Sequence, residues 1–359
     1  MLGSSKYRQT GGISANSLAS LDLPEEVRAS IAKLGNLGVA SGTWRSYTAG
    51  QKLLDSCEKE TGHNMPLPLS ETDTLFFIDW LQRIRNLSSG TIRCYLSGLR
   101  QLHISRGMTP PNFRTPLVKL ILKGIYNKEG IQKRGNGKAV RQPITLNMLL
   151  ILKTLISRLD MHQTDRSLIW AVCTMAFAGA FRIHELLSKI ESVYDPAQTL
   201  LAHDITQSSN KDGTITLHIS LKSPKESKTH TATVVDVYQS GSDTCPVTAF
   251  IRWKAAGRQE AKYPAFCWKS GSPLTGSKFN NLIKHMLAPY IDETKGKFVS
   301  HSFRIGLASM LGTLGYGDED IKAAGRWSSR AFQTYLKLTR NKRANMGKQI
   351  CNIAKQNTQ

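Results

Sequence analysis

The sequence predicts a mainly α-helical protein of two domains, the second of which contains a small antiparallel β-hairpin or sheet. Apolar residues recur at helical spacing through most of the 359 residues. Residues 128–143 are rich in Gly, Lys and Arg and have few apolar side chains, which is typical of an exposed linker. Residues 213–237 alternate apolar and polar side chains on both sides of a Lys-rich turn, as a β-hairpin does.

The first domain is expected at residues 23–127, after a flexible tail at residues 1–22 that is rich in Ser, Gly and Asn. Helix start signals precede three amphipathic segments, "SGTWRSYTAGQKLLDSCEKETG", "SETDTLFFIDWLQRI" and "LSSGTIRCYLSGLRQLHISRG". The apolar stripe of the third segment consists of Ile92, Leu96, Leu99 and Leu102. Its arginines project from other faces, so we expect a basic surface beside a packed one.

The second domain is expected at residues 144–340. Helical patterns run through "ITLNMLLILKTLISRL" and "RSLIWAVCTMAFAGAFRIHELLSKI", stop at the hairpin, and resume at "GSKFNNLIKHMLAPYI". Residues 341–359 alternate basic and apolar side chains, which predicts a helix that docks either on its own chain or on a neighbouring protomer.

The charge balance indicates a nucleic-acid partner. Lys and Arg number 48 against 26 Asp and Glu, a formal net charge of +22. Phosphates neutralise such an excess and release counterions on binding, although some proteins are merely basic. A membrane is not indicated, because no apolar run approaches spanning length and the N-terminus lacks a signal-peptide core, so we expect an intracellular protein. The residues expected to contact the nucleic acid are Arg45, Arg93, Arg100, Lys133, Arg134, Lys138 and Lys222.

The sequence has no motif for a metal or a cofactor, and we expect neither. "RIHELLSK" contains His-Glu without the second histidine of a zinc protease, and no Walker-type phosphate loop occurs. The six cysteines are scattered without a C-x-x-C pair, which is typical of reduced thiols.

Three short segments carry the remaining candidates for chemistry. Arg182 follows the apolar "AFAGAF" and stands one helical turn before Glu185, so it is either a functional cation or half of a structural ion pair. "VSHSFRIGLASMLG" puts His301 and Arg304 on the first turn of a helix, where backbone N–H groups attract anions. In "AAGRWSSRAFQTYLK", Tyr335 shares an apolar helical spacing with its neighbours, which taken alone favours packing. Those neighbours are Ala331, Phe332 and Leu338.

These segments, "FRIHEL", "HSFR" and "GRWSSRAFQTYLK", resemble in order and spacing the conserved boxes of tyrosine recombinases, the family of phage integrases and of Cre- and Xer-like enzymes. The first half is similar to the family's helical, SAM-like core-binding domain, notably in "TWRSY" and "TIRCYLSGLRQLH". The form of the last two boxes resembles recombinases of eukaryotic mobile elements such as Cryptons and DIRS-like retrotransposons, which implies a nuclear location.

The resemblance implies a role for each candidate. Tyr335 would be the nucleophile, Arg182 and Arg304 would hold the phosphate, and His301 would orient it and exchange a proton. A lysine in the hairpin would protonate the leaving group; Lys225 is expected in that role, with Lys222 as its close competitor.

Two further positions follow from the same resemblance. Glu185 would support the arginine and histidine from behind. The family usually has His or Trp nine residues before the nucleophile, and that offset falls on Arg326, with Trp327 one residue later. Either residue could contact the phosphate.

This residue set suits phosphodiester chemistry. Guanidiniums bind two phosphate oxygens at once and keep their charge at any working pH, so they can replace a metal at the transition state. A phosphotyrosine ester keeps the energy of the broken bond, so rejoining needs no ATP. We therefore expect a DNA recombinase that acts on double-stranded DNA as a tetramer on two sites. The alternatives are a catalytically inactive DNA-binding protein and a type IB topoisomerase.

Overall fold

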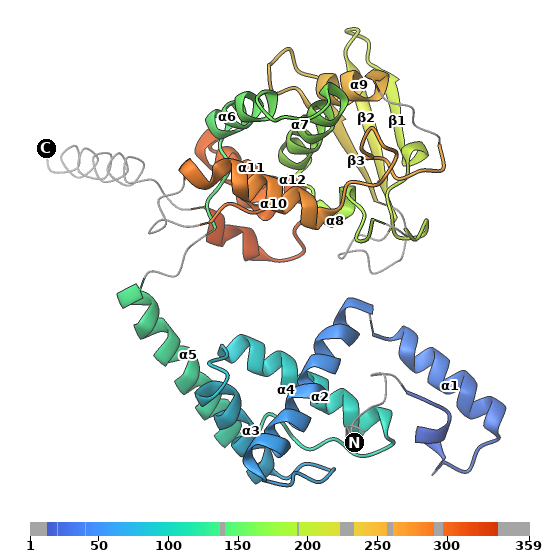
Figure 1. Cartoon of the computed structure of the whole chain (residues 1–359), viewed down its shortest axis with the longest axis vertical. Coiled ribbons are helices and arrows are strands. Elements are labelled where there is room, and N and C mark those ends of the chain that lie inside the picture. The colour runs from blue at the N-terminus through green and yellow to red at the C-terminus, as the bar shows by residue number, and fades with distance from the viewer. Residues whose placement is uncertain are drawn as a thin grey trace, which may run out of the picture. The chain divides into compact units, whose positions relative to one another are not determined.

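The computed structural model of the chain consists of two compact units, Met1–Gly137 and Lys138–Gln359 (Figure 1). The structure describes residues 13–19, 21–39, 41–136, 141–191, 194–222, 233–256, 261–290 and 297–336. The described residues are mainly helical, with a three-stranded antiparallel sheet in the second unit. The predicted fold class is confirmed.

The first unit is a helical bundle. Its described α-helices are α1 (Glu25–Leu37), α2 (Ser41–Thr61), α3 (Glu71–Arg83), α4 (Ser89–Ser105) and α5 (Pro116–Asn136). Helices α2 and α4 pack closely at Gly98, where a Cβ atom would lie 2.8 Å from Tyr47 Cα. The predicted stripe of α4 is buried, as expected, and its members are Ile92, Leu96, Leu99 and Leu102.

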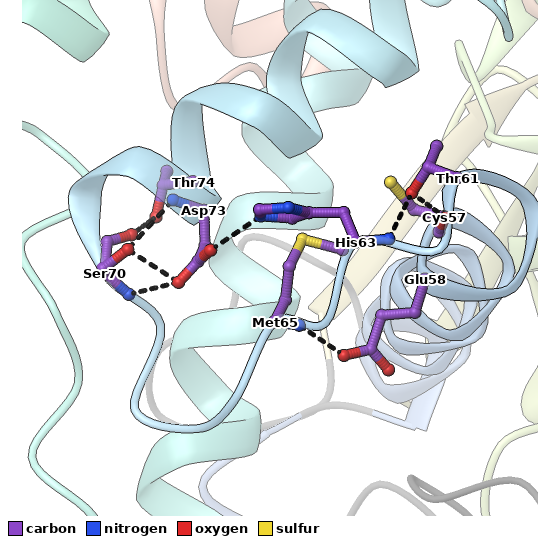
Figure 2. A network of polar contacts seen from close by, with 8 residues as sticks. All are labelled: Cys57, Glu58, Thr61, His63, Met65, Ser70, Asp73 and Thr74. Atoms are coloured by element: carbon purple, nitrogen blue, oxygen red, sulfur yellow. Dashed lines mark hydrogen bonds and ion pairs between the residues drawn. The ribbon is translucent and has the colours of Figure 1, made fainter.

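A polar network sets the start of α3 and holds the loop before it (Figure 2). Ser70 is the N-cap: its Oγ accepts a hydrogen bond from Asp73 N at 3.0 Å, and Ser70 N donates to Asp73 Oδ2 at 3.2 Å. The other oxygen of Asp73 lies 3.0 Å from His63 Nε2. Met65 N donates to Glu58 Oε1 at 2.7 Å, so the loop is tied to both α2 and α3.

Two predicted boundaries differ from the structure. Helix α5 continues to Asn136, so the first part of the segment predicted as a linker is helical. Lys, Gln, Arg and Ile in that part favour a helix and outweigh its glycines. Within the predicted tail, residues 16–18 form a 3₁₀ turn, η1 (Asn16–Leu18), and Ile13 exchanges two backbone hydrogen bonds with the Asn36 side chain, at 2.7 and 2.8 Å.

The second unit places helices around a small sheet. Its α-helices in the described residues are α6 (Leu146–Ser157), α7 (Gln163–Ala178), α8 (Ile183–Leu186), α9 (Pro246–Ala256), α10 (Gly276–Leu287), α11 (His301–Leu314) and α12 (Asp318–Gly325). Its 3₁₀ turns are η2 (Ala202–Asp204), η3 (Ala288–Tyr290) and η4 (Arg330–Tyr335). Helix α7 is buried along most of its length and packs against α6, α9 and α11.

The sheet has the order β1 (Ile205–Ser209), β2 (Ile215–Leu221), β3 (Thr233–Tyr238), all antiparallel. In its register Ile219 stands opposite both Ile205 and Val235, and β2 and β3 pack against α9. The predicted hairpin is β2–β3. Strand β1 was missed because four of its five residues are exposed, so it lacks the alternation of a half-buried strand.

Candidate active site

The turn between α7 and α8 presents Arg182 to Glu185. Ala180 takes a left-handed conformation with φ 45°, and Arg182 is the N-cap of α8. Arg182 donates from its backbone N to Glu185 Oε2 at 2.9 Å and from Nη1 to Glu185 Oε1 at 2.8 Å. The ion pair considered from the sequence is therefore present.

A second arginine shares the same carboxylate. Arg326 Nη2 donates to Glu185 Oε2 at 3.0 Å, and its Nη1 donates to Gly179 O at 2.8 Å. Its guanidinium carbon lies 4.9 Å from the centroid of the Phe181 ring. Arg326 ends α12 in a left-handed conformation with φ 53°.

Glu185 is thus an anion that holds two arginines from distant parts of the chain. Its side chain is 4% exposed, whereas those of Arg182 and Arg326 are 17% and 16% exposed. Burial opposes ionisation of this carboxyl, but the charge of Arg326 and the hydrogen bonds from Arg182 outweigh it. The pKa of Glu185 therefore lies below its ordinary value.

Arg304 connects the ends of α7 and α12 from the interior. Its side chain is fully buried on the first turn of α11. Nη1 donates to Ala180 O, and Nη2 donates to Gly325 O at 2.9 Å. The guanidinium carbon lies 4.9 Å from the Trp327 ring centroid. Trp327 is buried beside Phe332, so it supports Arg304.

His301 begins α11 and is surrounded by positive charge. Burial lowers the pKa of its imidazole to about 4, and the charges of Arg141, Arg304 and Arg182 contribute in that order. His301 is therefore neutral at neutral pH, and its ring has one donor and one acceptor nitrogen.

Arg141 was not among the residues expected to take part in this chemistry. It forms a parallel bridge with Lys297, shortly before α11. The only sequence signal was its position at the end of the basic segment predicted as a linker, and a pairing with residues more than 150 positions later leaves no local pattern.

The proposed nucleophile stands at the end of η4, but the Tyr335 side chain lies outside the described residues, as does Leu338. Within η4, Phe332 is buried and Ala331 is exposed, so the predicted apolar face is wrong at Ala331. The cause is the 3₁₀ turn that replaces the expected α-helical spacing. Leu336 packs on α11 at Gly312, where a Cβ atom would lie 2.8 Å from Leu336 Cδ2.

Of the two candidate lysines, only Lys222 is among the described residues. Lys225 lies outside the described residues. Lys222, at the end of β2, is bonded through Nζ to Asp204 Oδ2 at 2.9 Å and to Pro196 O at 2.9 Å. It also lines a cavity of about 80 Å³ together with His184 and Glu185. Lys222 and Glu185 therefore lie near each other.

The first unit has a basic hollow of about 1000 Å³ between α4, α5 and the loop that joins them. Arg93 and Arg100 line it, and no acidic residue is among its lining residues. Other basic residues that line it are Arg114, Lys119 and Lys123. Arg45 is exposed on α2. The side chains of Lys133 and Arg134, and all of Lys138, lie outside the described residues.

No described helix is both long enough and apolar enough to cross a bilayer. Within the described ranges, no cluster of three or more His, Cys, Asp or Glu side chains could hold a metal ion.

No family model and no curated protein matches the sequence. Solved structures do match. The XerH site-specific recombinase, bound to palindromic difH substrate in a post-cleavage complex, is 15% identical with a TM-score of 0.57, over 90% of this chain and 82% of that one. The Tn1549 transposon integrase with circular intermediate DNA is 16% identical with a TM-score of 0.53, over 89% of this chain and 96% of that one.

A lambda integrase dimer bound to a COC′ core site is 13% identical with a TM-score of 0.51, over 85% of this chain and 74% of that one. The protein thus has the fold of the tyrosine recombinases over most of its length, which confirms the resemblance found in the sequence.

Proposed function

We propose that this protein is a site-specific DNA recombinase that cleaves and rejoins DNA strands through Tyr335, without a metal or ATP. The observation that supports this best is a cluster of basic groups in a chain with the recombinase fold: Arg182 and Arg326 share Glu185, and His301 lies within electrostatic reach of Arg182 and Arg304. Four groups that suit a phosphate meet there from three separate segments.

In the proposed cleavage step, the Tyr335 oxygen attacks the phosphorus of a phosphodiester. A bond from that oxygen to phosphorus forms, the bond from phosphorus to the 5′-oxygen breaks, and a 3′-phosphotyrosyl ester results. Neutral His301 accepts the phenol proton, and Lys225 donates a proton to the departing 5′-oxygen. Attack by another strand's 5′-hydroxyl reverses these bonds and releases Tyr335.

The roles that we propose for the three arginines follow from how exposed their side chains are. Arg182 and Arg326 reach the surface, and we assign direct phosphate contact to them. Arg304, fully buried, adds a third positive charge from the interior, where a low dielectric strengthens its effect. Arg326 then fills the position that His or Trp takes in the family, and Trp327 packs on Arg304.

The Lys222 contacts favour Lys225 as the general acid. The Lys222 ammonium group is already bonded to a carboxylate and a carbonyl, and it would have to leave both to reach a departing 5′-oxygen. Lys222 would instead anchor the hairpin segment beside the site.

We further propose that each unit contacts duplex DNA, with the basic hollow of the first unit binding backbone phosphates through Arg93 and Arg100. Two DNA sites would then be joined by a tetramer of the protein. Localisation to the nucleus remains an expectation of the resemblance.

Covalent capture tests this function without knowledge of the target site. The full-length protein is incubated with a pool of nicked duplexes of random sequence, and DNA that stays attached under denaturing conditions is sequenced. We expect the wild type to enrich one sequence family and Tyr335→Phe to capture nothing.

Capture by both proteins, or by neither, would contradict the assignment of Tyr335, and capture by neither would favour an inactive DNA-binding protein. With the enriched DNA in hand, half-site exchange separates the remaining classes. A recombinase joins a cleaved strand to a new partner, whereas a topoisomerase reseals only the original strand.

A further inference from the structure

The segment that follows α5 along the chain forms part of the candidate active site. Gln142 N donates to Lys297 O at 3.0 Å, and Ile144 N donates to Ser302 O at 3.0 Å. Arg141 and Lys297 form an isolated parallel β-bridge between these two segments. The segment is therefore paired with the residues that lead into α11.

A glycine in α11 allows this pairing. A Cβ atom on Gly306 would lie 2.0 Å from Ile144 O, closer than any real side chain tolerates. Only glycine at this position lets the Ile144 backbone lie on the helix. The sequence of α11 thus fixes the place of the segment that carries Arg141.

This pairing brings Arg141 next to His301. Burial is the largest cause of the lowered His301 pKa, and among the cations that add to it Arg141 comes ahead of Arg304 on the same helix and Arg182 at α8. From α10, the group that faces this turn is the neutral amide of Asn280, whose Oδ1 accepts from Ser300 N at 2.8 Å.

Arg141 is also open to a ligand. Its side chain is exposed, whereas Arg304 is fully buried. An exposed guanidinium at the helix end where His301 lies can reach an anion that approaches from solvent.

We propose that Arg141 is a further phosphate-contacting residue of this site. It binds the phosphate of the cleaved strand beside His301, and the close approach of the Ile144 backbone to Gly306 positions it there. This rests on the proposed function. It adds one cation to those predicted from the sequence, carried by the segment that joins the two units along the chain.

The first measurement needs no DNA. The full-length protein with ¹³C-labelled histidine is titrated with acid, and the His301 resonance is assigned with His301→Gln. Arg141→Ala is expected to raise the His301 midpoint by about one pH unit toward its ordinary value, because a positive neighbour is lost. Arg141→Lys keeps most of the lowering.

Arg158→Ala is the matched control. Arg158 is an exposed arginine at the end of α6, so the variant loses the same charge and should leave the His301 midpoint unchanged. An unchanged midpoint in Arg141→Ala, or an equal rise in both alanine variants, would overturn the placement of Arg141.

The second measurement tests phosphate contact. Inorganic phosphate is titrated into each protein while the His301 resonance is followed. Loss of one charge-assisted contact should weaken the dissociation constant about 10-fold in Arg141→Ala, with Arg141→Lys in between and Arg158→Ala unchanged. Equal phosphate binding in Arg141→Ala and the wild type would overturn the contact.

The third measurement uses DNA recovered by covalent capture. Arg141→Ala should slow single-turnover adduct formation about 10- to 100-fold, and the acid limb of its pH profile should move to higher pH. If the wild type captures no DNA, the proposed function fails and the two titrations still decide the role of Arg141. If the wild type reacts and Arg141→Ala matches its rate and pH profile, only the inference about Arg141 fails.

Discussion

Replacing Glu185 by Gln should destabilise the second unit strongly. The carboxylate accepts three charge-assisted bonds, two from Arg182 at 2.9 and 2.8 Å and one from Arg326 at 3.0 Å. Each such bond contributes about 1.5–3 kcal/mol, against a desolvation cost of several kcal/mol per buried ion. Removing the anion leaves two mostly buried arginines without their counter-charge, and we expect a loss of about 3–5 kcal/mol at pH 7.

The assay is urea denaturation, in which unfolding is monitored through the hydrogen exchange of peptides from α7 and α11. These peptides report on the second unit alone. Glu191→Gln is the control, since Glu191 pairs with Lys278 at 2.6 Å on the surface, with the two side chains 43% and 49% exposed. Such a pair contributes about 0.2–1 kcal/mol. Equal losses in the two variants would refute the role of Glu185 as the centre of the site.

The loss of stability in Glu185→Gln should depend on pH. The Glu185 pKa is lower in the folded protein than its ordinary value of 4.5. Its stabilisation is therefore complete above the ordinary value and is lost as pH falls through the folded one. The difference between wild type and Glu185→Gln should shrink in acid.

Four other substitutions test the packing and the basic hollow. Gly98→Ala should destabilise the first unit by about 1–3 kcal/mol in urea denaturation, because its Cβ would lie 2.8 Å from Tyr47 Cα. Gly124→Ala, with no atom within 4 Å of the added Cβ, should instead stabilise α5 by up to about 1 kcal/mol. Trp327→Ala should cost about 3–5 kcal/mol by the same measurement, through the cavity left beside Arg304. Arg93→Ala should lower the salt slope of DNA binding by about 0.9, measured by fluorescence anisotropy at several salt concentrations.

Each of these predictions has an outcome that would contradict the structural feature on which it rests. Equal effects at the two glycines would mean that the helix contact at Gly98 is not tight. A Trp327→Ala protein as stable as the wild type would remove Trp327 from the core. An unchanged salt slope in Arg93→Ala would show that the hollow does not bind phosphate.

The sequence predicted the local features of this fold well. The stripe on α4, the β2–β3 hairpin and the start of α11 at His301 each depend on neighbours within a few residues, where spacing is informative. The pair of Arg182 and Glu185 could be anticipated for the same reason.

What the sequence did not predict depends on distant contacts. Nothing near Arg326 indicates that it shares Glu185, since that contact joins residues 141 positions apart. Arg141 was missed likewise, because its place follows from a backbone pairing and a close approach at Gly306. The sequence does not predict the continuation of α5, because the basic and Gly-rich composition of residues 128–136 is typical of a linker although several of these residues favour a helix.

The burial of the Phe332 side chain limits how far Tyr335, the residue proposed to attack DNA, can move. Phe332 lies in a small apolar cluster with Trp327, Ile321 and Ala308. Tyr335 is three residues further on, and three residues span at most about 11 Å. While Phe332 stays in that cluster, the proposed nucleophile stays within that distance of it. Reaching a phosphate farther away would require Phe332 to leave the cluster, at a cost of about 3–5 kcal/mol, so we expect the proposed cleavage to occur on DNA bound by the same subunit.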